Sequence, residues 1–331
     1  MRDLAEDIEE SAIADALAEG WGFDAASLEY APVGAGSFHW LARAGGGTRG
    51  FVTVDDLDAK LWLGDTRASV LEGLERAFDT ARALRDHGLA FVAAPIATSR
   101  GGTLLPLGAR HAVALFPFVD GEASSNGEHD AAGRAAVLEL LAPLHEAGSA
   151  VASTASTAGL HISGRQHLEA ALRELDRPWA GGPFSEPARE ALARHASVVV
   201  ELLALADRFA ADVASRGSEW VVTHGEPHAG NVMRTADGCV LVDWDTVALA
   251  PPERDLWMVA ADGVDTYTRA TGHELDEVAV DFFTLTWDLK DLAEYLHPLR
   301  SPHRRSKDTA FALEVVRNFA SIRERWASFL D

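Results

Sequence analysis

The most constraining feature of this sequence is a polar loop between two short apolar runs, WVVT and CVLV, in an otherwise alanine-rich half of the chain. The loop, residues 224–231, reads HGEPHAGN and contains Glu226, followed five residues later by Asn231. Asp243 comes twelve residues after Asn231, directly after the second apolar run. Short apolar runs bounded by glycine and acidic residues are typical of β-strands. The sequence therefore predicts a loop and two short strands that bring these three side chains together.

The five-residue interval has a chemical meaning. The catalytic loop of protein kinases has the same interval between its catalytic Asp and its metal-binding Asn, and a second metal-binding Asp follows on a short hairpin. In-line phosphoryl transfer needs a carboxylate near the acceptor hydroxyl and oxygen ligands for Mg²⁺ on the β- and γ-phosphates. The pattern predicts that Glu226 is the catalytic acid/base and that Asn231 and Asp243 bind the metal.

The rest of the chain predicts an α+β fold with two lobes. Three apolar runs separated by glycines (SLEYAPV, FHWLARA and GFVTV) indicate an antiparallel β-meander, and 3.6-residue periodicity indicates helices. The predicted helices are residues 5–18, 68–86, 131–147, 165–176 and 185–216, and a further strand is predicted over residues 112–119. This order of elements predicts a β-rich N-terminal lobe with one helix (1–117) and a larger, mainly helical C-terminal lobe (118–331). A ligand cleft is expected between the two lobes.

Composition limits the function classes. The net charge of −22 repels a phosphate backbone, so nucleic acid is not an expected partner. The same charge would attract a cationic substrate, and it is equally compatible with acidity that only keeps the protein in solution. The single cysteine, Cys239, permits no intramolecular disulfide. Neither a signal peptide nor an apolar stretch of about 18 residues is found, which predicts a cytoplasmic protein without a membrane partner. The sequence does not predict an oligomeric state.

The stretches HGEPHAGN and LVDWDTVALAPPERDLW resemble the aminoglycoside-phosphotransferase (APH) superfamily. APPERDL is most similar to its spectinomycin-phosphotransferase-like branch. The resemblance implies a protein-kinase-like fold with ATP and Mg²⁺ bound between the lobes. It implies that His224 and His228 brace the loop and that Asp255 is structural.

The resemblance also assigns positions outside the loop. Leu144-His145 resembles a pair that commonly ends a helix in the family. The remaining implied positions are Gly34, Gly36 and Ser37 in a phosphate-covering loop, Phe116 and Phe118 in an interlobe hinge at the nucleotide, and Asp288, Asp291 and Glu294 in a helix beside the acceptor site.

Two residues depart from the family pattern. Glu226 stands where an Asp is usual, and Thr53 stands where kinases carry the strand lysine that holds the α- and β-phosphates. Lys60, beyond an acidic turn at 55–58 that is predicted to be solvated, is the nearest lysine. Arg67 is a second candidate cation. The predicted lysine partner on the following helix is Glu75, with Glu72 as second choice.

Three functions are compatible with this pattern. The first is a kinase that transfers the γ-phosphoryl of ATP to a hydroxyl of a polar small molecule, such as an aminoglycoside or aminocyclitol antibiotic. The second, favoured by Thr53 and Glu226, is a kinase-fold protein that binds a nucleotide or small molecule with little or no activity. The third is a zinc-dependent hydrolase or other metalloenzyme that uses His224 and His228.

Overall fold

The computed structural model describes residues 1–4, 7–34, 36–60, 62–123, 129–217, 219–259 and 263–330. Its chain forms two compact units. The first contains residues 1–159 and 219–276, and the second contains residues 160–218 and 277–331. These units divide the chain at other places than the predicted lobes, and the lobe boundary at residue 117 stays a prediction.

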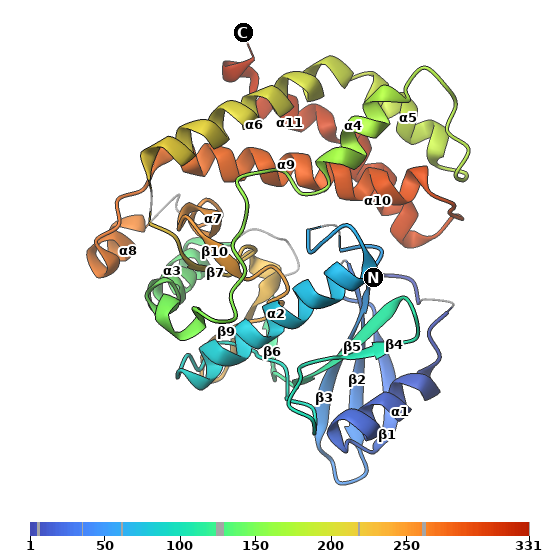
Figure 1. The fold of residues 1–331 in the computed structure, drawn as a ribbon, viewed down its shortest axis with the longest axis vertical. Coiled ribbons are helices and arrows are strands. Elements are labelled where there is room, and N and C mark those ends of the chain that lie inside the picture. Colours follow the sequence, from blue (N-terminus) through green and yellow to red (C-terminus); the bar gives the residue numbers. More distant parts are fainter. Residues whose placement is uncertain are drawn as a thin grey trace. The chain divides into compact units, whose positions relative to one another are not determined.

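The first unit contains a five-stranded sheet with the order β1-β2-β3-β5-β4, in which all neighbours are antiparallel (Figure 1). Its strands are β1 (Ala25–Ala31), β2 (Ser37–Ala44), β3 (Arg49–Asp56), β4 (Leu105–Leu107) and β5 (His111–Pro117). The predicted meander is confirmed as β1-β2-β3. Because side chains alternate along a strand, the sheet has two different faces.

Each face of this sheet carries one helix. On one face, Ile13 and Leu17 of α1 (Glu10–Trp21) pack in one cluster with Trp40 and Val52. On the other face, α2 (Arg67–Asp86) contributes Val70, Leu74 and Phe78 to a cluster with Ala112 and Ala114. The apolar stripe predicted for residues 68–86 is confirmed.

The rest of the first unit carries the loop that the sequence singled out. Its elements are β6 (Gly121–Ala123), α3 (Ala131–Glu146), η1 (Ala147–Val151), β7 (Val221–Thr223), η2 (Ala229–Asn231), β8 (Val232–Thr235), β9 (Gly238–Leu241), β10 (Ala248–Ala250), α7 (Glu253–Leu256) and α8 (Val264–Thr271). The two predicted strands exist but belong to different sheets. β9 forms a hairpin with β8, which the residues between the two predicted strands supply, whereas β7 pairs with β10, which follows β9 in the chain.

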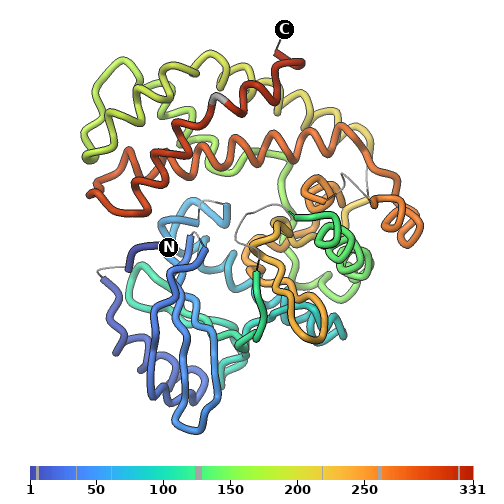
Figure 2. The backbone as a smooth tube through the Cα atoms, turned by 180° about the vertical axis from the view of Figure 1, so that it is seen from behind, coloured from blue at the N-terminus to red at the C-terminus, as the bar shows by residue number. Residues whose placement is uncertain are grey.

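The second unit is helical. Its elements are α4 (Arg165–Arg173), α5 (Ser185–Ala193), α6 (Ala196–Arg216), α9 (Glu277–Arg300), α10 (Lys307–Arg317), α11 (Phe319–Arg325) and η3 (Ala327–Phe329). The long α9 packs against α4, α6 and α10 (Figure 2). The helix predicted over 185–216 is interrupted between Ala193 and Ala196, so it forms two helices.

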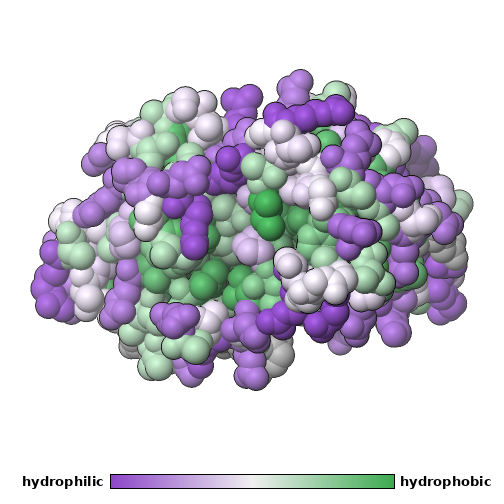
Figure 3. All heavy atoms as spheres, turned by 90° about the horizontal axis from the view of Figure 1, so that it is seen from below, coloured by the Kyte–Doolittle hydropathy of each residue, from purple (hydrophilic) through white to green (hydrophobic). Residues whose placement is uncertain are grey.

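Hydrophilic side chains surround the face seen in Figure 3, and apolar side chains gather toward its centre. Among the described residues, no helix is both long enough and apolar enough to span a bilayer.

Candidate active site

The β8–β9 hairpin brings Asn231 and Asp243 to one place. Val232 pairs with Leu241, and one step further the Val242 N–H donates to the Asn231 carbonyl over 3.0 Å. Asn231 therefore precedes one strand at the point where Asp243 follows the other. A hairpin of this length explains the twelve-residue interval in the sequence.

Both side chains present oxygen atoms suited to a hard cation. Asn231 Nδ2 donates to the Glu226 carbonyl over 2.9 Å, so the amide oxygen of Asn231 remains available as an acceptor. Asp243 is exposed and makes no hydrogen bond or ion pair with any other described residue. Its φ of +65° is the only positive φ of a described non-glycine residue. Such strained backbone is often found at functional sites.

The polar loop itself is anchored by Asp255 at the start of α7. Its carboxylate accepts from the backbone N–H groups of His224 (2.8 Å) and Gly225 (2.6 Å). It also accepts from His145 Nε2 over 3.0 Å. Burial opposes the charge, yet the hydrogen bond and charge of His145 keep the pKa of Asp255 below its usual value. The charged carboxylate thus fixes the conformation of the loop.

His224 has a defined structural role. Its Nδ1 accepts from the Glu226 N–H (3.2 Å), so Nε2 carries the proton and donates to the Val242 carbonyl (2.9 Å). Burial lowers the pKa of His224, which keeps this ring neutral. His228 Nδ1 accepts from the Gly230 N–H over 3.1 Å. Because both nitrogens of His224 are used, the ring has no atom left for zinc.

Gly225 cannot carry a side chain in this loop. Its φ is +97°, and a Cβ would lie 2.4 Å from Nη2 of Arg254. Arg254 is held in place by Thr223 Oγ1 (2.7 Å) and the Thr246 carbonyl (2.8 Å). We expect Gly225→Ala to lower the free energy of unfolding by about 2–4 kcal/mol, measured by urea denaturation.

The matched control is Gly88→Ala. Gly88 has a φ of +111°, and no atom lies within 4 Å of the place where its Cβ would stand, so it reports backbone strain without the contact to Arg254. Equal losses of unfolding free energy in the two variants would show that the contact with Arg254 does not add to the effect of backbone strain.

Lys60 joins the five-stranded sheet to the turn after Asp243. Its Nζ lies 2.5 Å from Asp245 Oδ2 and 3.0 Å from Asp55 Oδ1, and the side chain is 1% exposed. Ser37 Oγ donates to the same Asp55 oxygen over 2.6 Å. Burial opposes the ammonium, but Asp245 and Asp55 outweigh burial and raise the pKa of Lys60. One cation therefore serves two buried carboxylates, and burial raises the pKa of Asp55.

The acidic turn and the helix after it differ from the sequence-based expectation. Asp55 and Asp56 are buried and Asp58 is exposed, so only the last acid of the turn reaches solvent. Glu75 and Glu72 lie on the exposed side of α2, and the partners of Lys60 are aspartates from elsewhere. Glu75 sits at the edge of the apolar stripe, and sequence periodicity does not resolve which way such a residue faces.

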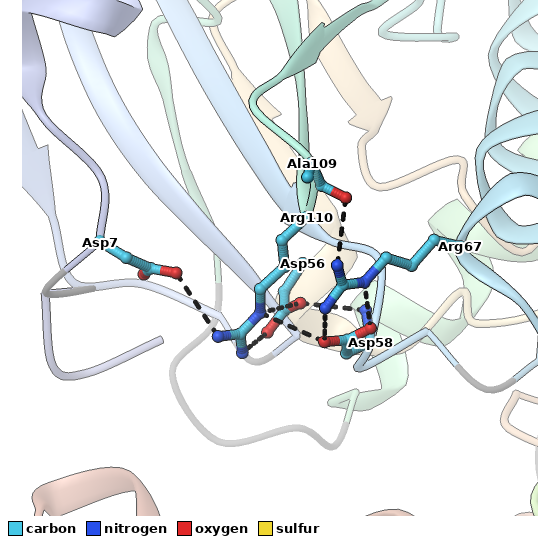
Figure 4. A network of polar contacts seen from close by, with 6 residues as sticks. All are labelled: Asp7, Asp56, Asp58, Arg67, Ala109 and Arg110. Atoms are coloured by element: carbon cyan, nitrogen blue, oxygen red, sulfur yellow. Dashed lines mark hydrogen bonds and ion pairs between the residues drawn. The ribbon is translucent and has the colours of Figure 1, made fainter.

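Arg67, the second candidate cation, is engaged by partners close to its own helix. It donates to both oxygens of Asp58 at 2.6 Å and to the Ala109 carbonyl at 3.3 Å (Figure 4). The neighbouring Arg110 binds Asp56 through two hydrogen bonds of 2.9 and 2.5 Å. These pairs join α2, the β3 end and the β4–β5 connection, which is a structural role.

The predicted phosphate-covering loop and hinge are only partly described. Gly34 (φ +68°) and Gly36 (φ +85°) have the backbone of a tight turn, and Ala35 lies outside the described residues. In the hinge, the Phe116 ring meets Phe78 of α2 edge-on at 5.4 Å. Arg49 covers the Phe118 ring at 4.0 Å. The nucleotide-binding role of these residues stays a prediction.

The three acids of α9 differ from one another. Asp288 is buried and accepts from Arg325 Nη1 and from Trp326 Nε1, each at 2.9 Å. It is therefore engaged inside the helical unit, a structural role that the sequence did not indicate. Glu294 lies 3.7 Å from Lys290, and Asp291 and Glu294 are partly exposed.

The loop and hairpin concentrate negative charge. Although Asp243 reaches solvent on one side, protein atoms around its carboxylate limit hydration. This desolvation, together with the charges of Asp245 and Glu226, raises the pKa of Asp243 well above its usual value, against the effect of Lys60. Carboxylate and amide oxygens next to excess negative charge form the donor set that Mg²⁺ prefers. The residues present therefore fit a divalent cation. The sequence placed Asp55 only in the acidic turn, and for Asp245 it left both a metal contact and a local hydrogen bond open.

Comparison with known proteins identifies the family. Residues 47–295 match the model of the phosphotransferase enzyme family, APH. A segment of 131 residues is 34% identical to Protein StrN of Streptomyces griseus, and this match spans 39% of each protein.

Two solved structures have the same fold at low identity. Spectinomycin phosphotransferase APH(9)-Ia, in complex with ADP and spectinomycin, has a TM-score of 0.71 at 15% identity over 95% of each chain. A microcompartment-associated aminopropanol kinase has a TM-score of 0.62 at 15% identity, covering 98% of this chain and 99% of its own. The α+β, kinase-like fold predicted from the sequence is confirmed. With a family match that spans most of its length, the chain belongs to the phosphotransferase enzyme family.

Proposed function

We propose that this phosphotransferase transfers the γ-phosphoryl group of ATP to a hydroxyl of a polar small molecule. The observation that carries the proposal is the meeting of Asn231 and Asp243 at one end of a hairpin, beside the loop of Glu226. This constellation would supply metal ligands and a carboxylate within one compact unit.

The roles of the residues follow from their chemistry. Asn231 Oδ1 and the Asp243 carboxylate would hold Mg²⁺, which when bound neutralises charge on the β- and γ-phosphates. Glu226 would orient the acceptor hydroxyl and accept its proton as the oxygen attacks phosphorus. Asp255 and His224 keep the loop in place through their hydrogen bonds to its backbone. Lys60 holds Asp245 next to Asp243.

The acceptor we propose is a hydroxylated, preferentially cationic compound, such as an aminocyclitol or aminoglycoside antibiotic or a small amino alcohol. The net charge of −22 favours a cation. Fold relatives include enzymes named for spectinomycin and for aminopropanol. Asp291 and Glu294 are the candidates for pairing with an acceptor ammonium. Antibiotic resistance is one role that fits such an acceptor, in a cytoplasm that supplies ATP and Mg²⁺.

A nucleotide-binding protein with little transferase activity is the second candidate. It is favoured by Thr53 at the lysine position, because Lys60 is already engaged by Asp55 and Asp245. Calorimetry with ATP, with and without Mg²⁺, together with a turnover assay, separates the two. Binding without turnover of any acceptor would favour this second candidate.

The test of the proposed reaction is Glu226→Gln. Wild-type protein is mixed with radiolabelled ATP, Mg²⁺ and a panel containing spectinomycin, aminopropanol and ethanolamine. With any acceptor that is turned over, we expect Glu226→Gln to lower kcat by roughly 10²- to 10⁴-fold, because the amide accepts no proton. The KM for ATP should stay near the wild-type value.

Glu226→Asp is the matched control, because it keeps the carboxylate and shortens the side chain by one methylene. It should retain far more activity than Glu226→Gln. Unchanged turnover in Glu226→Gln would refute the assignment of Glu226 as the base. If the wild type forms no labelled product, none of the compounds in the panel is its acceptor.

A further inference from the structure

Thr53 stands where kinases carry the strand lysine, and the side chain of His39 lies beside it. His39 on β2 lies directly opposite Thr53 on β3, and Ser37 and Asp55 form the pair two residues further toward the glycine turn. Because alternate residues of a strand point to one side, all four side chains share one face of the sheet. This is the face that also carries the Asp55–Lys60 ion pair.

The ring of His39 is fixed on two sides. It stacks on Phe51 with ring centroids 5.0 Å apart and an angle of 27° between the planes. Its Nδ1 lies 3.4 Å from Thr53 Oγ1. The other nitrogen, Nε2, makes no hydrogen bond with any described residue and lies 3.5 Å from the place where Gly34 would carry a Cβ. The imidazole thus points an unused nitrogen toward the glycine turn.

Burial and the charges around the ring keep it neutral. Burial, the N-terminal ammonium and Lys60 lower the pKa of His39 to about 3. The neutral ring carries one proton, and when that proton is on Nε2, Nδ1 can accept from the Thr53 hydroxyl. The ring then offers one N–H donor below the turn that is predicted to cover the phosphates.

We propose that His39 Nε2 donates a hydrogen bond to the α- or β-phosphate of the nucleotide in place of the absent strand lysine, and that Thr53 positions the ring. This inference rests on the proposed function, since it requires a nucleotide next to Gly34 and Ser37. The side chain of Lys60 is 1% exposed and its ammonium has two carboxylate partners, Asp55 and Asp245, so the proposal gives this contact to His39.

The experiment is calorimetry of the full chain with Mg·ADP and with adenosine. His39→Phe keeps an aromatic ring on Phe51 but removes the donor. A lost hydrogen bond to a charged group corresponds to roughly 10- to 150-fold weaker binding, so ADP affinity should fall by that factor while adenosine affinity stays unchanged. His39→Gln places an amide N–H at a similar reach and should recover part of the ADP affinity.

Thr53→Val tests the positioning role. It removes the hydroxyl at constant shape, and we expect the KM for ATP to rise while kcat is retained, with recovery in Thr53→Ser. A purely structural contribution of Thr53 would not separate KM from kcat in this way.

The outcomes distinguish the inference from the function beneath it. If the wild type binds ADP and the ADP affinity of His39→Phe is within twofold of the wild-type value, the proposed phosphate contact is wrong, whereas the proposed function is unaffected. Equal weakening of ADP and adenosine would overturn it too, because the effect would not be on the phosphates. A wild-type protein that binds neither ADP nor ATP would overturn both the inference and the proposed function.

Discussion

Asp243→Asn is expected to lower kcat/KM by roughly 10³-fold or more, which corresponds to about 4 kcal/mol of transition-state stabilisation. The reason is that Asp243 is the one charged ligand of the proposed metal pair. Asn is the right substitution because it tolerates the positive φ of +65° at this position. The change therefore removes the charge without adding backbone strain. Steady-state kinetics at several Mg²⁺ concentrations measures the effect.

A second readout and a control make this result specific. Mg²⁺ should raise the nucleotide affinity of the wild type and have little effect on that of Asp243→Asn. Asp237→Asn removes the same charge from the exposed turn of the same hairpin and should behave as the wild type. If Asp243→Asn keeps wild-type activity and Mg²⁺ dependence, the metal site is elsewhere.

Lys60→Met should destabilise the first unit by about 3–5 kcal/mol, because removing the cation leaves its buried carboxylate partners without a compensating charge. Asp55 and Asp245 are 1% and 6% exposed, and one oxygen of Asp55, Oδ2, already has no hydrogen-bond partner among the residues that the structure describes. Neither carboxylate can turn to water for compensation. Urea denaturation monitored by tryptophan fluorescence measures the loss, and kcat should fall because Asp245 no longer has a fixed position.

The double variant Lys60→Met/Asp55→Asn keeps this prediction testable if the single variant does not fold. It removes one of the two stranded charges, so it should recover part of the lost stability. Additive losses from Lys60→Met and Asp55→Asn would contradict a direct interaction between the two side chains. So would a loss below about 1 kcal/mol in Lys60→Met, a value typical of exposed ion pairs.

Local patterns in the sequence predicted those parts of the site that are close in the chain. The interval between Asn231 and Asp243 encodes a hairpin, and hairpin geometry depends on neighbouring residues only. The meander of β1 to β3 and the apolar stripe of α2 were predicted for the same reason. Periodicity and turn residues are properties of short segments.

The partners of buried charges were not predictable in this way. Lys60 meets Asp245, 185 positions away in the sequence. Likewise, Asp56 meets Arg110 across the sheet. An acidic turn has the same composition whether it is solvated or covered, and only the packing of distant segments decides. The position of Glu75 on the exposed side of α2 is a related case, because a residue at the margin of a stripe is placed by its neighbours in space.

The pairing of α6 with α9 has a consequence for the segment that carries the loop and the hairpin. Residues 219–276 leave the helical unit at the end of α6 and return to it at the start of α9, and these two helices pack on each other. The pairing therefore closes a chain loop that contains every proposed metal ligand and the proposed base. Closing a loop restricts its unfolded conformations. Substitutions that loosen α6 from α9, remote from any reacting atom, should thus increase the conformational freedom of the segment at both of its ends.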